Sequence, residues 1–264
     1  MAVKPELVLD KSFLRAVSPT YVAELCREYR VIMPGALLFE LLTGDEATRT
    51  ECFGRLPAGH NPVEIVEHVG KLLQYEARRN GPCPSLAEVR TVMLYRFNAK
   101  LADGSFTLNP QQKAALAEWS NELAEDVRLH KQMSAATHNW FAELQTATPA
   151  TMASAVARAR ERVLDVKFVR RRYGSITRPS FPRKDLVDRR WTFFRWTQVH
   201  LLAALEYIRR YGIGNPNVDA KRLENDVVDM QYQVMALLAG RIATRDQGMR
   251  AGVLALRPDM ETFQ

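Results

Sequence analysis

Apolar and polar positions give the two ends of the chain alternating strand and helix patterns. Near the start, ELVLD (6–10) is a mostly apolar run that ends at an acid, and RVIMP (30–34) is a β-branched run that ends at proline. A helical pattern follows each run: SPTYVAELCREY (18–29), with Ser18 as its N-cap, and GALLFELL (35–42), which stops at a Thr-Gly pair. The order strand, helix, strand, helix predicts a parallel α/β layer.

From about residue 45 to residue 215 the pattern changes to long segments with helical periodicity. Short stretches that carry proline or glycine separate these segments, which are 62–79, 85–100, 110–145, 149–172 and 186–211. We therefore expect a mainly helical insertion over 46–215. Part of this insertion is expected to complete the α/β core formed by 1–45 and 216–264.

The last fifty residues return to the pattern of the first fifty. DAKRLENDVVDMQYQVMALLAG (219–240) predicts a helix that ends at a C′ glycine, and RIATRD (241–246) predicts a short strand that ends at an acid. GVLALRP (252–258) fits either a strand or a helix. The expected fold class is α/β, with a parallel sheet flanked by helices and interrupted by the large helical insertion.

Acidic residues recur beside these predicted strands and helices. Asp10 and Asp246 end strands, Glu40 lies about one turn into a helix, and Asp226 and Asp229 share one helix face. Ligands of parallel sheets collect at the carboxyl ends of the strands, where grouped carboxylates suit Mg²⁺ or Mn²⁺. A metal held there can activate water for attack on a phosphodiester. Taken singly, each acid also fits a turn, a helix cap or a solvated position.

The same segments resemble the PIN domain, a family of metal-dependent nucleases common among ribonuclease toxins and RNA-processing proteins. The resembling stretches lie within about 5–45 and 219–258 and are LVLDKSFL, MPGALLFELLTG, ENDVVDMQYQVMALLAG and IATRDQGM. The resemblance implies a PIN-like fold, cleavage of RNA, and a toxin or defence role. It implies a cation site formed by Asp10, Glu40, Asp229 and Asp246, with Asp226 assisting and Thr244 positioning the site. The long helical stretch departs from the family, whose domain is usually about half as long as this chain.

Positive charge is concentrated in one part of the sequence. The formal net charge is +7, and segment 158–190 holds 12 Lys/Arg against 4 Asp/Glu, a net of +8, which leaves −1 for the remainder. This concentration favours a polyanionic partner. Arginine binds phosphate and aromatic rings stack on unpaired bases, so RRRYGSITRPSFPRK (170–184) is predicted to be a loop that guides RNA. The candidate contacts are Arg170, Arg171, Arg172, Arg183 and Lys184.

Other features narrow the range of functions. The sequence has no run of about 18 uncharged apolar residues, so we expect no membrane span, and its start does not read as a signal peptide. Three cysteines in no paired motif indicate reduced thiols in a cytoplasmic protein. The predicted function is an endoribonuclease that uses Mg²⁺ or Mn²⁺. DNA as substrate stays open, as does a non-catalytic nucleic-acid-binding or interaction protein on the same fold. An inhibitor protein and a second copy of the chain are further candidate partners.

Overall fold

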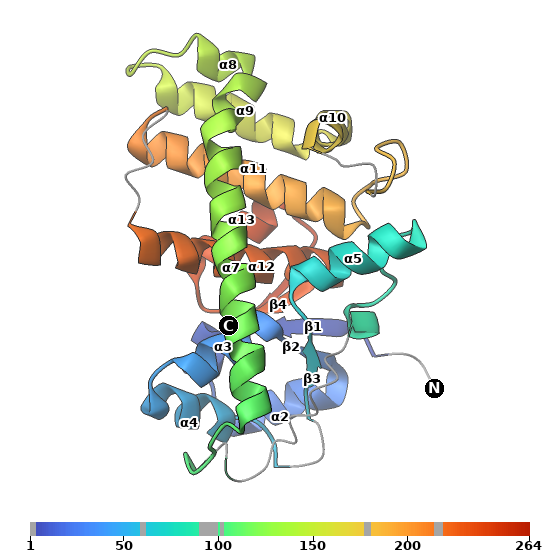
Figure 1. Ribbon diagram of the computed structural model, residues 1–264, viewed down its shortest axis with the longest axis vertical. Helices are drawn as coiled ribbons and strands as arrows, with labels where there is room; N and C mark the ends of the chain where they lie inside the picture. The colour runs from blue at the N-terminus through green and yellow to red at the C-terminus, as the bar shows by residue number, and fades with distance from the viewer. Residues whose placement is uncertain (1–3, 59–61, 90–99, 101–102, 177–180, 214–218) are drawn as a thin grey trace. The chain divides into compact units, whose positions relative to one another are not determined.

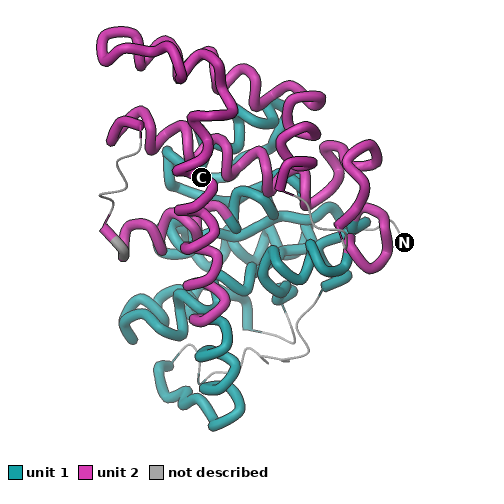
Figure 2. The backbone as a smooth tube through the Cα atoms, turned by 45° about the horizontal axis from the view of Figure 1, so that its top comes forward, with its two compact units in different colours: residues 1–75, 83–119, 231–264 teal, residues 76–82, 120–230 magenta. Residues whose placement is uncertain are grey.

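The structure is a computed structural model that describes residues 4–58, 62–89, 100, 103–176, 181–213 and 219–264. The chain divides into two compact units (Figure 2). Unit 1 comprises Met1–Tyr75, Cys83–Trp119 and Gln231–Gln264. Unit 2 comprises Glu76–Pro82 and Ser120–Met230. Three helices cross a boundary between the units, namely α5 (Val69–Arg79), α7 (Pro110–Thr137) and α12 (Ala220–Ala239).

Unit 1 is built on a five-stranded parallel sheet. Its strands are β1 (Glu6–Leu9), β2 (Arg30–Pro34), β3 (Glu64–Val66), β4 (Arg241–Ala243) and β5 (Glu261–Phe263). The strand order is β3-β2-β1-β4-β5, with β1 between β2 and β4 (Figure 1). The chain therefore adds β2 and β3 on one side of β1, whereas β4 and β5 lie on the other side. The direction of strand addition reverses between β1 and β4.

The central strand β1 is an apolar run because a strand with helices on both faces of its sheet has no solvated side. Leu7, Val8 and Leu9 have no exposed surface. On one side of β1, Val8 is in register with Ile32 of β2, and on the other side it is in register with Ile242 of β4. The core of unit 1 is therefore centred on the strand that leads directly to Asp10.

Helices of unit 1 begin and end at residues suited to helix termini. Ser18 accepts a hydrogen bond from the backbone N–H of Tyr21 at 3.2 Å and thereby caps α2 (Pro19–Glu28), as the sequence predicts. Gly240 has a φ of +78°, which glycine adopts readily, and it follows the last residue of α12. The other helices of unit 1 include α1 (Lys11–Leu14), α3 (Gly35–Thr43), α4 (Glu46–Gly54), the 3₁₀ helix η1 (Leu86–Val89) and α13 (Gln247–Leu256).

The secondary-structure elements described in unit 2 are all helices. Besides parts of α5, α7 and α12, it contains η2 (His138–Trp140), α8 (Ala142–Gln145), α9 (Met152–Leu164), α10 (Val166–Ile176) and α11 (Thr192–Tyr211). The carboxylate of Glu76 is fully buried and accepts hydrogen bonds from the backbone N–H groups of Thr192 (2.6 Å) and Phe193 (3.2 Å). A buried acid from α5 thus satisfies free N–H groups at the start of α11.

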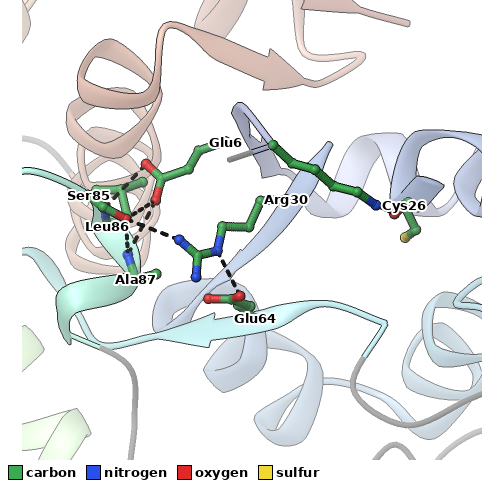
Figure 3. Close-up of polar contacts among 8 residues, drawn as sticks. Glu6, Cys26, Arg30, Glu64, Ser85, Leu86 and Ala87 are labelled. Atoms are coloured by element: carbon green, nitrogen blue, oxygen red, sulfur yellow. Dashed lines mark hydrogen bonds and ion pairs between the residues drawn. The ribbon is translucent and has the colours of Figure 1, made fainter. Parts of the chain in front are cut away.

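Charged residues at the amino ends of β1, β2 and β3 form polar contacts within unit 1 (Figure 3). Arg30 Nε donates to a carboxylate oxygen of Glu64 at 2.7 Å. Glu6 accepts from three donors at the start of η1, namely Ser85 Oγ (2.6 Å), Leu86 N (3.2 Å) and Ala87 N (3.3 Å). Backbone N–H groups at a helix start carry partial positive charge, so each of these two acids faces positive potential.

The parallel sheet and its flanking helices confirm the expected α/β class. Some elements differ from the sequence pattern. Segment 62–79, expected to be helical, begins with β3, and segment 252–258, where strand and helix were both open, lies mostly in α13. The pattern does not predict β5, because three residues are too few to show a period of two. Residues 90–99 of the expected segment 85–100 lie outside the described residues.

Candidate active site

The carboxyl edge of the sheet is where β1 and β4 direct the chain towards α1 and α13. Asp10 directly follows β1, and Thr244 directly follows β4, with Leu9 and Ala243 in register between the two strands. This strand pair is also the place where the direction of strand addition reverses. In open parallel sheets such a reversal leaves a crevice beyond the carboxyl ends of the strands, and ligands bind there.

Asp10 is a carboxylate held by hydroxyl groups in a poorly solvated position. Only 6% of its surface is exposed. Thr244 Oγ1 donates to Asp10 Oδ2 at 2.7 Å, and Ser12 Oγ donates to the same oxygen. Burial raises the pKa of Asp10, and the nearby charge of Glu40 raises it further, whereas the hydrogen bonds from Ser12 and Thr244 act in the opposite direction. A cation close to Asp10 would therefore stabilise the ionised form of its carboxyl group.

Ser12 connects the turn after β1 with the turn after β4. While donating to Asp10, its Oγ accepts from the backbone N–H groups of Arg245 (2.9 Å) and Asp246 (3.2 Å). The Asp246 N–H also lies 3.0 Å from Thr244 Oγ1. Sequence reasoning did not identify Ser12. The sequence feature that could have indicated this role is a serine two residues after a strand-ending acid, because a side chain at that position can reach back to the acid.

Glu40 receives a donor on each of its carboxylate oxygens. Lys11 Nζ lies 2.5 Å from Oε1, and the hydroxyl of Tyr232 donates to Oε2 at 2.7 Å. Lys11 begins α1 and Tyr232 lies in the part of α12 that belongs to unit 1. Neither residue was identified from the sequence. Lys11 could have been found as the neighbour of Asp10, but nothing local marks Tyr232 as a partner of Glu40.

Asp246 begins α13 and is exposed. Its Oδ1 accepts a hydrogen bond from the backbone N–H of Met249 at 2.8 Å, so Asp246 is the N-cap of this helix. The structure therefore shows the capping role that the sequence left open. A capping carboxylate keeps further lone pairs, so this contact is compatible with binding a second ligand.

Asp226 and Asp229 belong to unit 2, because the unit boundary crosses α12 after Met230. Within unit 2, the hydroxyl of Tyr207 donates to Asp226 Oδ2 at 2.6 Å. Burial raises the pKa of Tyr207 strongly, and the hydrogen bond to Asp226 adds to this effect. Asp229 precedes Tyr232 by three residues and so shares the helix face that carries Tyr232. Asp226 thus has a structural contact of its own.

The carboxylates at the carboxyl edge suit a hard divalent cation by their chemistry. Carboxylate oxygens are preferred ligands of Mg²⁺ and Mn²⁺, and the buried charge of Asp10 would be stabilised by such an ion. Among the residues that the structure describes, however, no group of three or more His, Cys, Asp or Glu side chains is assembled that could hold a metal ion. A cation site would therefore require these side chains to move closer together.

The basic segment of unit 2 contains both structural and exposed cations. Residues 170–176, predicted to be part of a loop, are the end of α10. Arg170 Nε donates to the carbonyl of Val187 at 2.6 Å, and Arg172 donates to the carbonyl of Trp140 at 3.2 Å. These two guanidinium groups hold elements of unit 2 together.

The remaining candidates in this segment are exposed. Arg183 pairs with Asp185 at 2.7 Å, an exposed ion pair that solvent screens strongly. Arg171 and Lys184 are also exposed. Residues 177–180, in the middle of the predicted segment, lie outside the described residues. Of the five predicted contacts, Arg171, Arg183 and Lys184 are therefore exposed, and Arg183 also pairs with Asp185.

Comparison of the chain with protein-family models, with curated proteins and with solved structures gave no match. Within the described part of the chain, no helix is long and apolar enough to cross a membrane. Functional inference consequently depends on the geometry of the sheet edge and on the distribution of charge.

Proposed function

We propose that the chain is a PIN-like endonuclease that hydrolyses RNA phosphodiester bonds with the help of a divalent cation. The observation that carries the proposal is Asp10, a buried carboxylate at the reversal point of a parallel sheet, bound by hydroxyl groups rather than by a guanidinium. An ionised group that is poorly solvated and faces a ligand crevice is typical of a functional site.

The proposal assigns a role to each residue of the site. Asp10, Glu40 and Asp246, which all lie in unit 1, hold the cation. Ser12 and Thr244 fix the orientation of Asp10 through its Oδ2. Tyr232 fixes Glu40 through Oε2. When bound, Mg²⁺ or Mn²⁺ would supply an activated water and stabilise negative charge on the phosphate.

RNA is the proposed substrate class because the positive charge of the chain is concentrated in 158–190. A carboxylate cluster by itself repels a polyanion, so a nuclease of this type needs cations that attract the backbone. The exposed side chains of Arg171 and Lys184 suit this role. Single-stranded DNA carries the same phosphate charge and is the alternative substrate.

A specific set of contacts favours a second candidate function, a nucleic-acid-binding protein without catalytic activity. Glu40 is paired with Lys11, Asp246 caps α13 and Asp226 holds Tyr207. Each of these acids has a structural contact, and such a protein would need no cation. Asp10 argues against this candidate, since a buried acid with a raised pKa lowers stability without a compensating role.

The deciding experiment measures cleavage of a labelled mixed-sequence RNA, with single-stranded DNA in parallel, in Mn²⁺, Mg²⁺ or EDTA. Wild type is compared with Asp10→Asn and Asp246→Asn. Glu6→Gln is the matched control, because it makes the same acid-to-amide change at the opposite edge of the sheet. We expect cleavage that requires metal, is lost in both Asp variants and persists in Glu6→Gln. RNA binding without cleavage in any metal would instead establish the binding protein.

A further inference from the structure

Lys11 places a positive charge directly beside Glu40, one of the candidate acids. It follows Asp10 in the chain and begins α1, and its ammonium lies 2.5 Å from Glu40 Oε1. The two side chains are 35% and 23% exposed, so this pair is partly shielded from water. A partly shielded ion pair is screened less than one on the open surface.

The same contact obstructs a divalent cation. Tyr232 donates to Oε2 of Glu40 and Lys11 lies against Oε1, so a metal ion that uses a remaining lone pair of either oxygen lies near the Lys11 ammonium. Mg²⁺ coordinates carboxylate oxygens at about 2.1 Å, a distance that brings it close to the ammonium. Two positive charges at such separation repel each other strongly. A cation bound to Glu40 therefore weakens the contact between Lys11 and Glu40.

An ammonium that leaves a carboxylate needs another anion, and a phosphodiester supplies one. Lys11 carries three N–H donors on a flexible stem, which allows it to exchange one oxygen partner for another. If the substrate takes over Lys11, Glu40 becomes available to the cation. The metal and the phosphodiester then each favour binding of the other, and this coupling is reciprocal.

We propose that Lys11 is an internal counter-ion that competes with the divalent cation for Glu40 and is released by the phosphodiester. It acts as a positioning residue that couples metal binding to substrate binding. This inference rests on the proposed function, because it requires a cation site at the carboxyl edge.

The test measures Mn²⁺ binding by electron paramagnetic resonance of the free ion, so it needs no turnover. The full chain is titrated as wild type, Lys11→Met and Lys11→Arg, with Lys4→Met as the matched control. Lys4 donates to the carbonyl of Cys26 at 3.1 Å and is exposed. Each titration is repeated with excess dimethyl phosphate, a stable phosphodiester anion, and with trimethyl phosphate, its neutral counterpart.

We expect Lys11→Met to bind Mn²⁺ about tenfold more tightly than wild type, because one positive charge beside the site is removed. Dimethyl phosphate should tighten Mn²⁺ binding by wild type and should have little effect on Lys11→Met. Lys11→Arg keeps the charge and should resemble wild type, as should Lys4→Met. Trimethyl phosphate should change none of the proteins.

Two results would overturn the inference while leaving the proposed function intact. One is a wild type that binds Mn²⁺ and a folded Lys11→Met that binds it no more tightly. The other is an equal effect of dimethyl phosphate on both proteins. Should Lys11→Met not fold, a Lys11→Gln variant replaces it under the same criteria. If neither wild type nor any Lys11 variant binds Mn²⁺, the proposed metal-dependent function fails, and the inference fails with it.

Discussion

The two edges of the parallel sheet both carry carboxylates but stabilise them in different ways. At the amino edge, Glu64 is paired with Arg30, and Glu6 accepts from Ser85 and from two backbone N–H groups at the start of η1. At the carboxyl edge, Asp10 is buried and held by two neutral hydroxyl groups. Glu64 thus has a cationic partner and Glu6 lies against the start of η1, whereas burial is the largest influence on Asp10 and raises its pKa.

Under the proposed function, this difference separates a structural edge from a catalytic one. A carboxylate paired with a guanidinium or with free helix N–H groups contributes to stability. A desolvated carboxylate near a second acid has a raised pKa, and its ionised form lowers stability. Proteins retain such groups where a ligand relieves the unfavourable charge. The comparison therefore predicts opposite effects for similar substitutions at the two edges.

The largest effect is expected for Asp10→Asn. Cleavage of RNA in Mn²⁺ should fall at least about 100-fold, a typical effect of removing one catalytic group. Stability at pH 7 should stay equal or rise, because the pKa of Asp10 is raised in the folded state and the amide removes the buried charge. Thermal unfolding followed by circular dichroism, beside the cleavage assay, checks both. A marked fall in melting temperature would assign Asp10 to the structural class.

Glu6→Ala is expected to show the reverse. Removing the carboxylate leaves the donors Ser85 Oγ, Leu86 N and Ala87 N without their acceptor, at a cost of about 2–3 kcal/mol in the free energy of unfolding. Urea unfolding measures this loss. The cleavage rate of the folded variant should remain within about twofold of wild type. Activity that falls in proportion to that of Asp10→Asn would show that the two edges are not distinct.

Much of the sheet was predictable because its central strands carry strong local signals. In β1 and β2 a continuous apolar run ends at an acid or at proline, and this pattern is typical of a buried parallel strand. In β3 and β5 three residues are too few to establish a period, so their strand character comes from pairing with β2 and β4. Such pairing is decided by tertiary contacts rather than by sequence neighbours.

The same limit applies to the candidate site. Acids at the ends of strands could be predicted, because topology alone brings strand ends to one edge. Their partners could not, since Thr244 is 234 residues from Asp10 and Tyr232 is 192 residues from Glu40. The sequence also assigns five cations to one RNA-guiding loop, but folding directs Arg170 and Arg172 to backbone carbonyls. Because such partners are far apart in the sequence, the sequence does not show which charged groups already form hydrogen bonds within the folded chain.

Two buried histidines in unit 2 extend the comparison of buried charged groups from an acid, Asp10, to a base. Nδ1 of His130 lies 3.0 Å from Nδ1 of His200, and burial lowers the pKa of His130 to about 4 and that of His200 well below its usual range. In the unfolded chain His130 takes up a proton below about pH 6.5, whereas in the folded chain it does so only at about pH 4. Stability is therefore complete above pH 6.5 and decreases as the pH falls.

We expect the free energy of unfolding to be lower at pH 5 than at pH 7 by about 2 kcal/mol from His130, and His200 should lower it in the same direction. Urea unfolding across this range measures the slope, and His200→Phe should make it shallower even if the variant is less stable overall. A wild-type profile that is flat between pH 7 and pH 5 would mean that the pair is solvated.

The smallest effects are expected for a matched pair in the basic segment of unit 2. Arg171→Gln removes an exposed cation, so RNA affinity should fall about two- to threefold and the salt dependence of binding should decrease by about one ion, with stability unchanged. Arg170→Gln removes the hydrogen bond to the carbonyl of Val187 and should cost about 1 kcal/mol of stability. Fluorescence anisotropy at several salt concentrations and urea unfolding separate the two. Equal loss of RNA affinity in both variants would show that net charge, rather than the exposure of each guanidinium, determines binding.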